Sequence, residues 1–185
     1  MKILFVNACI RDNSRTLRLA KHLLSKLSGE MTEVRLQDEN IPPLNRESLK
    51  KRDSLLQNGN LSDESLVYAR DFAQADIIVI AAPYWDLSFP ALLKIYLESV
   101  TVSGITFCYE NDRPAGLCHA KKLYYVTTAG GPVMADFGFS YVKALAENLY
   151  GITDVSVFSA ENLDIEGSDA EAELEQAKSM IDKTL

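Results

Sequence analysis

Ile77-Ile78-Val79-Ile80-Ala81-Ala82 is the stretch that decides the fold. Six consecutive apolar residues, four of them β-branched, are typical of a strand that is buried on both faces. Such a strand lies inside a parallel sheet whose two faces are covered by helices. The run at 2–7, Lys-Ile-Leu-Phe-Val-Asn, has the same character and predicts a second central strand.

Helical and strand patterns alternate around these two runs. Hydroxyl residues at 14 and 16 precede an apolar pattern of helical spacing that stops at Ser28-Gly29. Five alternating strand and helix units require right-handed crossovers, so the fold class is α/β with a parallel sheet and helices on both faces. The other strands are predicted at 32–36, 123–128 and 155–158, and the other helices at 91–100, 136–150 and 168–185.

Length and composition fit one domain over residues 1–185. At 185 residues and 47% hydrophobic composition, the chain can bury one sizeable core. The polar segment at about 37–63 has too few apolar residues for a domain of its own and predicts a surface helix with a loop. A loop excursion is predicted at about 103–121.

Charge and cysteine content exclude several functions. The 19 Lys and Arg against 26 Asp and Glu give a net charge of −7, which opposes binding to nucleic acids and acidic membranes. No membrane span or export signal is recognisable, so we expect a cytoplasmic protein. The three cysteines do not form a disulfide framework, and neither His22 nor Cys118-His119 makes a metal-ligand set, so no metal is expected.

The loop at 7–16 predicts a phosphate-binding site. In parallel sheets, ligands bind beyond the carboxyl ends of the strands, and this loop follows the first strand. It contains neither GxGxxG nor GxxxxGK[ST], and it has no glycine. Arg11, two hydroxyls at Ser14 and Thr16, and the amides of a helix start suit a terminal phosphate. The alternative is that the two hydroxyls only cap the helix.

Two further loops follow strands at the same edge. Residues 83–90 contain Tyr84, Trp85 and two prolines, a combination that suits the binding of a flat heteroaromatic ring. The alternative is that the aromatic side chains pack against the next helix. In the segment 127–132, Gly130-Gly131 allows close backbone approach to a ligand, although alone it predicts only a turn. Three weak signals at one sheet edge together predict the site there.

Four segments carry a resemblance to a known family. They are Cys9-x-Arg11-x-x-Ser14-x-Thr16, the run from Ala82-Pro83-Tyr84-Trp85 to Leu93-Lys94, Gly104-Ile105-Thr106-Phe107, and Thr128-Ala129-Gly130-Gly131. With these segments the chain resembles, over nearly its whole length, the flavodoxin-like NAD(P)H:quinone oxidoreductases and FMN-dependent azoreductases.

The resemblance implies a flavodoxin-like doubly wound sheet of strand order 2-1-3-4-5 and a homodimer. It implies FMN as cofactor, NADH or NADPH as co-substrate, and a quinone, azo or nitro compound or a similar small oxidant as acceptor. FMN carries the chemistry, so no side chain is nominated as catalytic, and Tyr109 is a candidate substrate gate over the flavin of the partner subunit. The implied cofactor contacts are Cys9, Arg11, Ser14, Arg15, Thr16, Pro83, Tyr84, Trp85, Asp86, Leu87, Thr128, Ala129, Gly130 and Gly131.

The chain departs from the family pattern at two positions. Cys9 stands where azoreductases usually carry a phosphate-binding serine, and a thiol is a weaker donor than a hydroxyl. Asp86 stands where they often carry asparagine, and a carboxylate there would repel a reduced, anionic flavin unless only its backbone faces the cofactor. The side-chain roles of Cys9 and Asp86 therefore stay open.

Two other functions remain as alternatives. Cys9-x5-Arg15-Thr16 also satisfies the CX5R[ST] pattern of low-molecular-weight tyrosine phosphatases, in which a thiolate attacks the phosphate. The phosphatase loop favours glycine, which the loop at 7–16 lacks. The phosphatase family also expects an Asp-Pro general acid, and no Asp-Pro dipeptide occurs in this chain. A flavodoxin-type electron carrier would share the FMN site without needing access for a nicotinamide.

Overall fold

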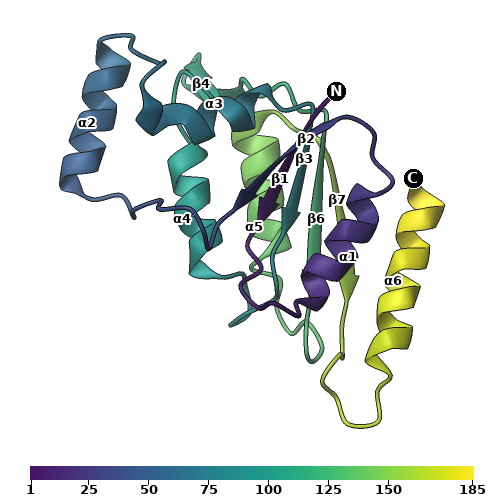
Figure 1. Ribbon diagram of the computed structural model, residues 1–185. Coiled ribbons are helices and arrows are strands. Elements are labelled where there is room, and N and C mark those ends of the chain that lie inside the picture. The colour runs from purple at the N-terminus through teal and green to yellow at the C-terminus, as the bar shows by residue number, and fades with distance from the viewer.

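A five-stranded parallel sheet forms the centre of the computed structural model, which describes residues 1–185 (Figure 1). The strand order is β2-β1-β3-β6-β7. This confirms the predicted flavodoxin-like order 2-1-3-4-5, because β6 and β7 are the fourth and fifth strands of this sheet. The strands are β1 (Lys2–Asn7), β2 (Glu30–Arg35), β3 (Ile77–Ala81), β6 (Lys122–Thr128) and β7 (Asp154–Ala160).

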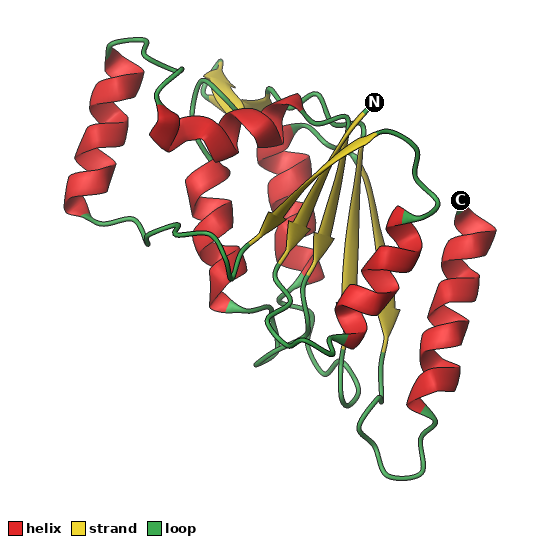
Figure 2. Ribbon diagram, in the orientation of Figure 1, coloured by secondary structure: helices red, strands yellow, loops and turns green.

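Helices cover both faces of the sheet (Figure 2). Side chains alternate along each strand, so β1 sends Ile3 and Phe5 toward one helical layer and Leu4 and Val6 toward the other. Helices α1 and α6 form the first layer, and α3, α4 and α5 form the second. The helices are α1 (Arg15–Leu24), α3 (Val67–Gln74), α4 (Ala91–Val100), α5 (Phe139–Leu145) and α6 (Ala170–Thr184). None of them combines the length and apolarity needed to cross a bilayer.

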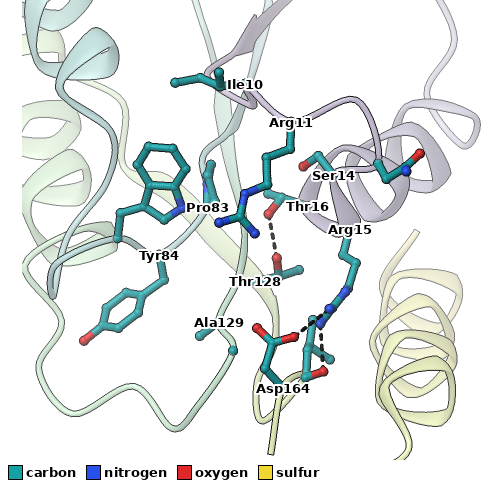
Figure 3. A pocket seen from close by; sticks show the side chains of 14 residues that line it. Ile10, Arg11, Ser14, Arg15, Thr16, Pro83, Tyr84, Thr128, Ala129 and Asp164 are labelled. Atoms are coloured by element: carbon teal, nitrogen blue, oxygen red, sulfur yellow. Dashed lines mark hydrogen bonds and ion pairs between the residues drawn. The ribbon is translucent and has the colours of Figure 1, made fainter.

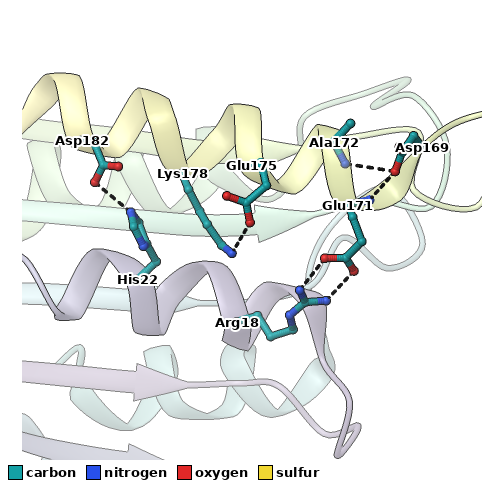
Figure 4. Close-up of polar contacts among 8 residues, drawn as sticks. All are labelled: Arg18, His22, Asp169, Glu171, Ala172, Glu175, Lys178 and Asp182. Atoms are coloured by element: carbon teal, nitrogen blue, oxygen red, sulfur yellow. Dashed lines mark hydrogen bonds and ion pairs between the residues drawn. The ribbon is translucent and has the colours of Figure 1, made fainter.

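Ion pairs connect α6 to α1, and the two helices also contribute apolar residues to one core cluster (Figure 4). Arg18 forms a two-pronged pair with Glu171, at 2.7 and 2.6 Å, and this bond lowers the pKa of the Glu171 carboxyl. The His22 ring lies 2.9 Å from Asp182, whose pKa is lowered by Lys26 and His22. His22 thus has a structural partner within the helical layer.

The polar insertion contains one peripheral helix, α2 (Arg46–Gln57). Its N-terminus is closed by a capping box between Asn45 and Ser48, and none of its residues is buried. Figure 1 shows α2 standing at the edge of the molecule, connected through a short 3₁₀ helix (Glu64–Leu66) to α3. Its stability therefore depends on capping and on the partly buried Leu55 and Leu56.

The predicted loop excursion contains an antiparallel hairpin, β4 (Phe107–Glu110) and β5 (Arg113–Gly116). Its two-residue turn, Asn111-Asp112, has φ angles of 51° and 62°, as a type I′ turn requires. Gly116 lies directly against the backbone at Gly151, which has φ 76° and ends a single π-helical turn (Ala146–Tyr150) after α5. The helix predicted over 136–150 thus begins at Phe139 and ends where expected.

We expect Gly116→Ala to destabilise the protein. A Cβ at this position would lie 2.2 Å from the Gly151 nitrogen and 2.2 Å from the Tyr150 carbonyl carbon, so backbone must move. Overpacking of this kind costs roughly 1–3 kcal/mol, and each kcal/mol lowers Tm by about 2–4 °C in a chain of this size. Calorimetry measures the change.

Gly131→Ala is the matched control, because a Cβ there meets only the Ile165 side chain at 3.8 Å and no positive φ opposes it. Equal Tm values for the two variants would show that the backbone at Gly116 and Gly151 accommodates a Cβ without cost.

Candidate active site

A pocket of about 440 Å³ lies at the carboxyl edge of the sheet (Figure 3). Asn7 pairs with Ala81 and Ala81 pairs with Val126, so β1, β3 and β6 end side by side and their loops meet. The pocket is lined by Ile10, Arg11, Asn13, Ser14, Arg15, Thr16, Pro83, Tyr84, Trp85, Thr128, Ala129, Gly130, Leu163 and Asp164.

The first loop supplies hydrogen-bond donors at the start of α1. The Ser14 hydroxyl accepts the Leu17 amide at 3.2 Å and so caps the helix, whereas the amides of Arg15 and Thr16 donate no hydrogen bond within the chain. Arg11 forms no ion pair, and its guanidinium points into the pocket (Figure 3). Free amides at a helix start beside a free cation are suited to an anion.

The second loop contains a strained two-residue turn. Trp85 and Ser88 exchange backbone hydrogen bonds of 3.0 and 2.8 Å around Asp86 and Leu87, whose φ angles are 49° and 67°. A left-handed conformation is unfavourable for a branched residue such as leucine, and strain of this kind collects at functional sites. The amides of Asp86 and Leu87 donate no hydrogen bond within the chain. Both side chains are exposed and lie outside the pocket wall.

The third loop is held by the first and the second. The Thr16 and Thr128 hydroxyl oxygens lie 2.6 Å apart, and the Tyr84 hydroxyl donates to the Ala135 carbonyl oxygen at 2.8 Å. Ala129 and Gly130 line the pocket. Gly131 does not, but its carbonyl accepts the Asn162 amide at 3.2 Å.

A fourth segment, which follows β7, also forms the wall. Leu163 and Asp164 lie beside Arg15, whose guanidinium donates to the Leu163 carbonyl at 2.8 Å and to the Asp164 carboxylate at 2.6 Å. The sequence-based site did not include these residues, nor Ile10 and Asn13 of the first loop. The loop after the fifth strand emerges at the same sheet edge as those after the first, third and fourth, and this shared position is the signal that points to Leu163 and Asp164.

Cys9 lies beneath the pocket and does not line it. Its side chain is 2% exposed, and its sulfur lies 3.8 Å from the Ala81 carbonyl oxygen. Burial raises the pKa of the Cys9 thiol to about 11, so the sulfur is a neutral thiol near pH 7. Tyr109 is also outside the pocket: it is 67% exposed on β4, with its ring edge-on to Phe107 at 5.6 Å.

The pocket wall combines two arginines with one carboxylate, and Tyr84, in the same loop as Trp85, lies across the pocket from Arg15 and Asp164 (Figure 3). A net positive wall beside free amides can hold an anionic group, and the aromatic end can hold a flat ring. No nucleophile and base lie together in the pocket wall, so the arrangement favours ligand binding over side-chain catalysis.

Comparison with known proteins identifies the same fold and relatives that are named as FMN-dependent enzymes. The family Flavodoxin_2, described as a flavodoxin-like fold, matches residues 1–185. The FMN-dependent NADH:quinone oxidoreductase of Lachnoclostridium phytofermentans is 35% identical, over 96% of this chain and 94% of that protein. The protein of the same description from Coprothermobacter proteolyticus is also 35% identical, over 95% of this chain and 94% of its own length.

Solved structures share the fold at lower identity. The azoreductase of Bacillus anthracis Sterne aligns with a TM-score of 0.84 at 23% identity, over 99% of both chains. The FMN-dependent NADH-azoreductase of Bacillus anthracis Ames Ancestor, determined with FMN, aligns with a TM-score of 0.83 at 20% identity, over 100% of this chain and 97% of that one. The chain therefore belongs to the flavodoxin-like fold family, together with the FMN-dependent NADH:quinone oxidoreductases that match it along nearly its whole length.

Proposed function

We propose that this protein is an FMN-dependent oxidoreductase that passes hydride from NADH or NADPH to a quinone, an azo compound or a similar small oxidant. One observation carries the proposal: loops after three parallel strands form one pocket, with the start of α1 on one side and the loop of Tyr84 and Trp85 on the other (Figure 3). The relatives named FMN-dependent NADH:quinone oxidoreductases support the same assignment.

The anion-binding end fits the phosphate of FMN. Arg11 has no internal counter-ion, and the amides of Arg15 and Thr16 are free to donate. A phosphate monoester would accept these amides and the guanidinium together, since charge-assisted hydrogen bonds are the strong ones. The volume of about 440 Å³ falls within the range of about 300–1,000 Å³ typical of small-molecule sites.

The other end would hold the ring. When bound, FMN supplies the ring that accepts and releases hydride. The Trp85 loop would position that ring, and the free amides of Asp86 and Leu87 would donate to its edge as fixed dipoles. In this arrangement Asp86 contributes its backbone and keeps its exposed carboxylate in solvent, which avoids repulsion with a reduced flavin.

The buried state of Cys9 disfavours the phosphatase alternative. A phosphatase of that class needs an accessible thiolate facing the phosphate, with its pKa lowered by its surroundings. Here the sulfur is covered and its pKa is raised to about 11. An electron carrier of the flavodoxin type would share the FMN site, and NADH oxidation by the holoprotein separates the two functions.

The purified protein is expected to bind FMN and to oxidise NADH with menadione as acceptor.

Arg11→Ala removes one charge-assisted contact to the phosphate and should weaken FMN binding roughly 10-fold, with little effect on riboflavin. Flavin fluorescence quenching measures both affinities. Arg46→Ala, the same charge change at the start of α2, is the control and should leave both unchanged. A protein that cannot be reconstituted with FMN, or that hydrolyses an aryl phosphate through Cys9, would refute the assignment.

Thiol reactivity gives an independent check on Cys9. With a pKa of about 11, about one Cys9 thiol in a thousand is ionised at pH 8, so iodoacetamide should modify half-buried Cys108 long before Cys9. Reaction at Cys9 should increase as the pH rises toward 11, because the thiolate is the reacting form. Peptide mass spectrometry reads each site, and rapid modification of Cys9 at pH 7 would contradict the burial described above.

The assembly and environment are also proposals. We infer a cytoplasmic homodimer without nucleic-acid or membrane partners, in which Tyr109 of one protomer lies over the flavin of its partner. The support is the exposure of Tyr109 on the β4–β5 hairpin and the net charge of −7. Sedimentation should give the mass of two chains, and Tyr109→Ala should change KM for menadione more than FMN affinity. A monomer with full activity would exclude this arrangement.

A further inference from the structure

A carboxylate occupies the wall of the pocket at the end that we assign to the phosphate. Asp164 lines the pocket, and its Oδ1 lies 2.6 Å from the Arg15 Nη2 (Figure 3). The second Arg15 nitrogen donates to the Leu163 carbonyl at 2.8 Å. Arg15 is the first residue of α1, so its side chain extends from the helix start whose amides are free, and its guanidinium lines the same pocket.

The backbone fixes Asp164 at this place. Its amide donates to the Gly130 carbonyl at 2.8 Å, and the Leu163 amide donates to the Ala129 carbonyl at 3.2 Å. Gly130 leaves room for the carboxylate, because a Cβ on Gly130 would lie 2.4 Å from Asp164 Oδ2. The acid is therefore built into the wall, although it is 149 residues from Arg15 in the sequence.

An acid in this position acts against a phosphate in two ways. It repels the dianion, and it occupies a guanidinium that could otherwise bind it. Arg11, by contrast, has no internal partner (Figure 3). The Arg15 and Asp164 side chains are 35% and 63% exposed, and exposed ion pairs are weak, so a phosphate can displace the carboxylate from Arg15.

We propose that Asp164 is an internal counter-ion for Arg15, which the cofactor phosphate must displace, and that it thereby sets how strongly the site distinguishes a phosphate monoester from its dephosphorylated form. This rests on the proposed function. A flavin without phosphate leaves the pair of Arg15 and Asp164 intact and gains nothing from Arg15. A flavin with phosphate binds the Arg15 guanidinium only by breaking its ion pair with Asp164.

Asp164→Asn tests the proposal by removing the charge and keeping the shape. We expect the Kd for FMN to fall roughly 3- to 10-fold, because the variant removes both the exposed ion pair with Arg15 and the repulsion of the phosphate. The Kd for riboflavin should stay within about 2-fold. Fluorescence quenching of each flavin on the full-length apoprotein measures both values. The gain for FMN should shrink at high salt, because screening weakens both effects.

Glu171→Gln is the matched control. It makes the same charge change in another exposed arginine pair, with Arg18, outside the pocket. It should alter FMN affinity by less than about 2-fold. Asp164→Ser is a second uncharged variant, and thermal unfolding of each variant confirms that it folds.

The outcomes are distinct. Tighter FMN binding in both Asp164 variants, with riboflavin binding and Glu171→Gln unchanged, supports the proposal. FMN binding that is unchanged or weaker in both folded variants overturns it, because the acid would then support the pocket wall and would not compete with the phosphate. Failure of the unaltered protein to bind FMN at all would overturn the proposed function and this inference with it.

Discussion

The structure depends on one constraint, the parallel register of strands that are buried on both faces. Because Asn7, Ala81 and Val126 lie in one row across β1, β3 and β6, the segments that follow them emerge at one edge. Three loops that are far apart in the sequence then share one pocket. The chemistry assigned to the site needs no rare motif, because the sheet itself gathers a helix start, an aromatic loop and the Ala129-Gly130 segment.

Most of the fold could be predicted from the sequence, and the exceptions have physical causes. The central strands are apolar runs, and the mostly exposed β2 lies where an alternating pattern predicted a strand, so the five strands of the sheet and their order followed from pattern and resemblance. The strand β5 reads Arg-Pro-Ala-Gly, which carries no strand pattern. It exists as a strand because its backbone pairs with β4 and because Gly116 fits against Gly151, and both contacts become visible only in three dimensions.

The site, like the fold, was predicted from the sequence in part. Strand order brought Arg11, Thr16, Trp85 and other predicted residues into one pocket, but it could not say which loop side chains face inward, since loops have no periodicity. Cys9 turns into the core, and the strained turn at Asp86 and Leu87 presents backbone. The contribution of the segment after β7 depends on ion-pair and backbone contacts across most of the chain, which local sequence patterns do not encode.

The pairing of α1 with α6 has a consequence for biosynthesis. The ribosome completes α1 at residue 24, but α6, which lies beside α1 and helps to cover the same apolar cluster, begins only at residue 170. At about 5–20 residues per second, the nascent chain carries the apolar side chains of Leu19 and Leu23 without that cover for roughly 7–30 s. During that interval a chaperone has an exposed apolar surface to bind, and the arrival of α6 closes it.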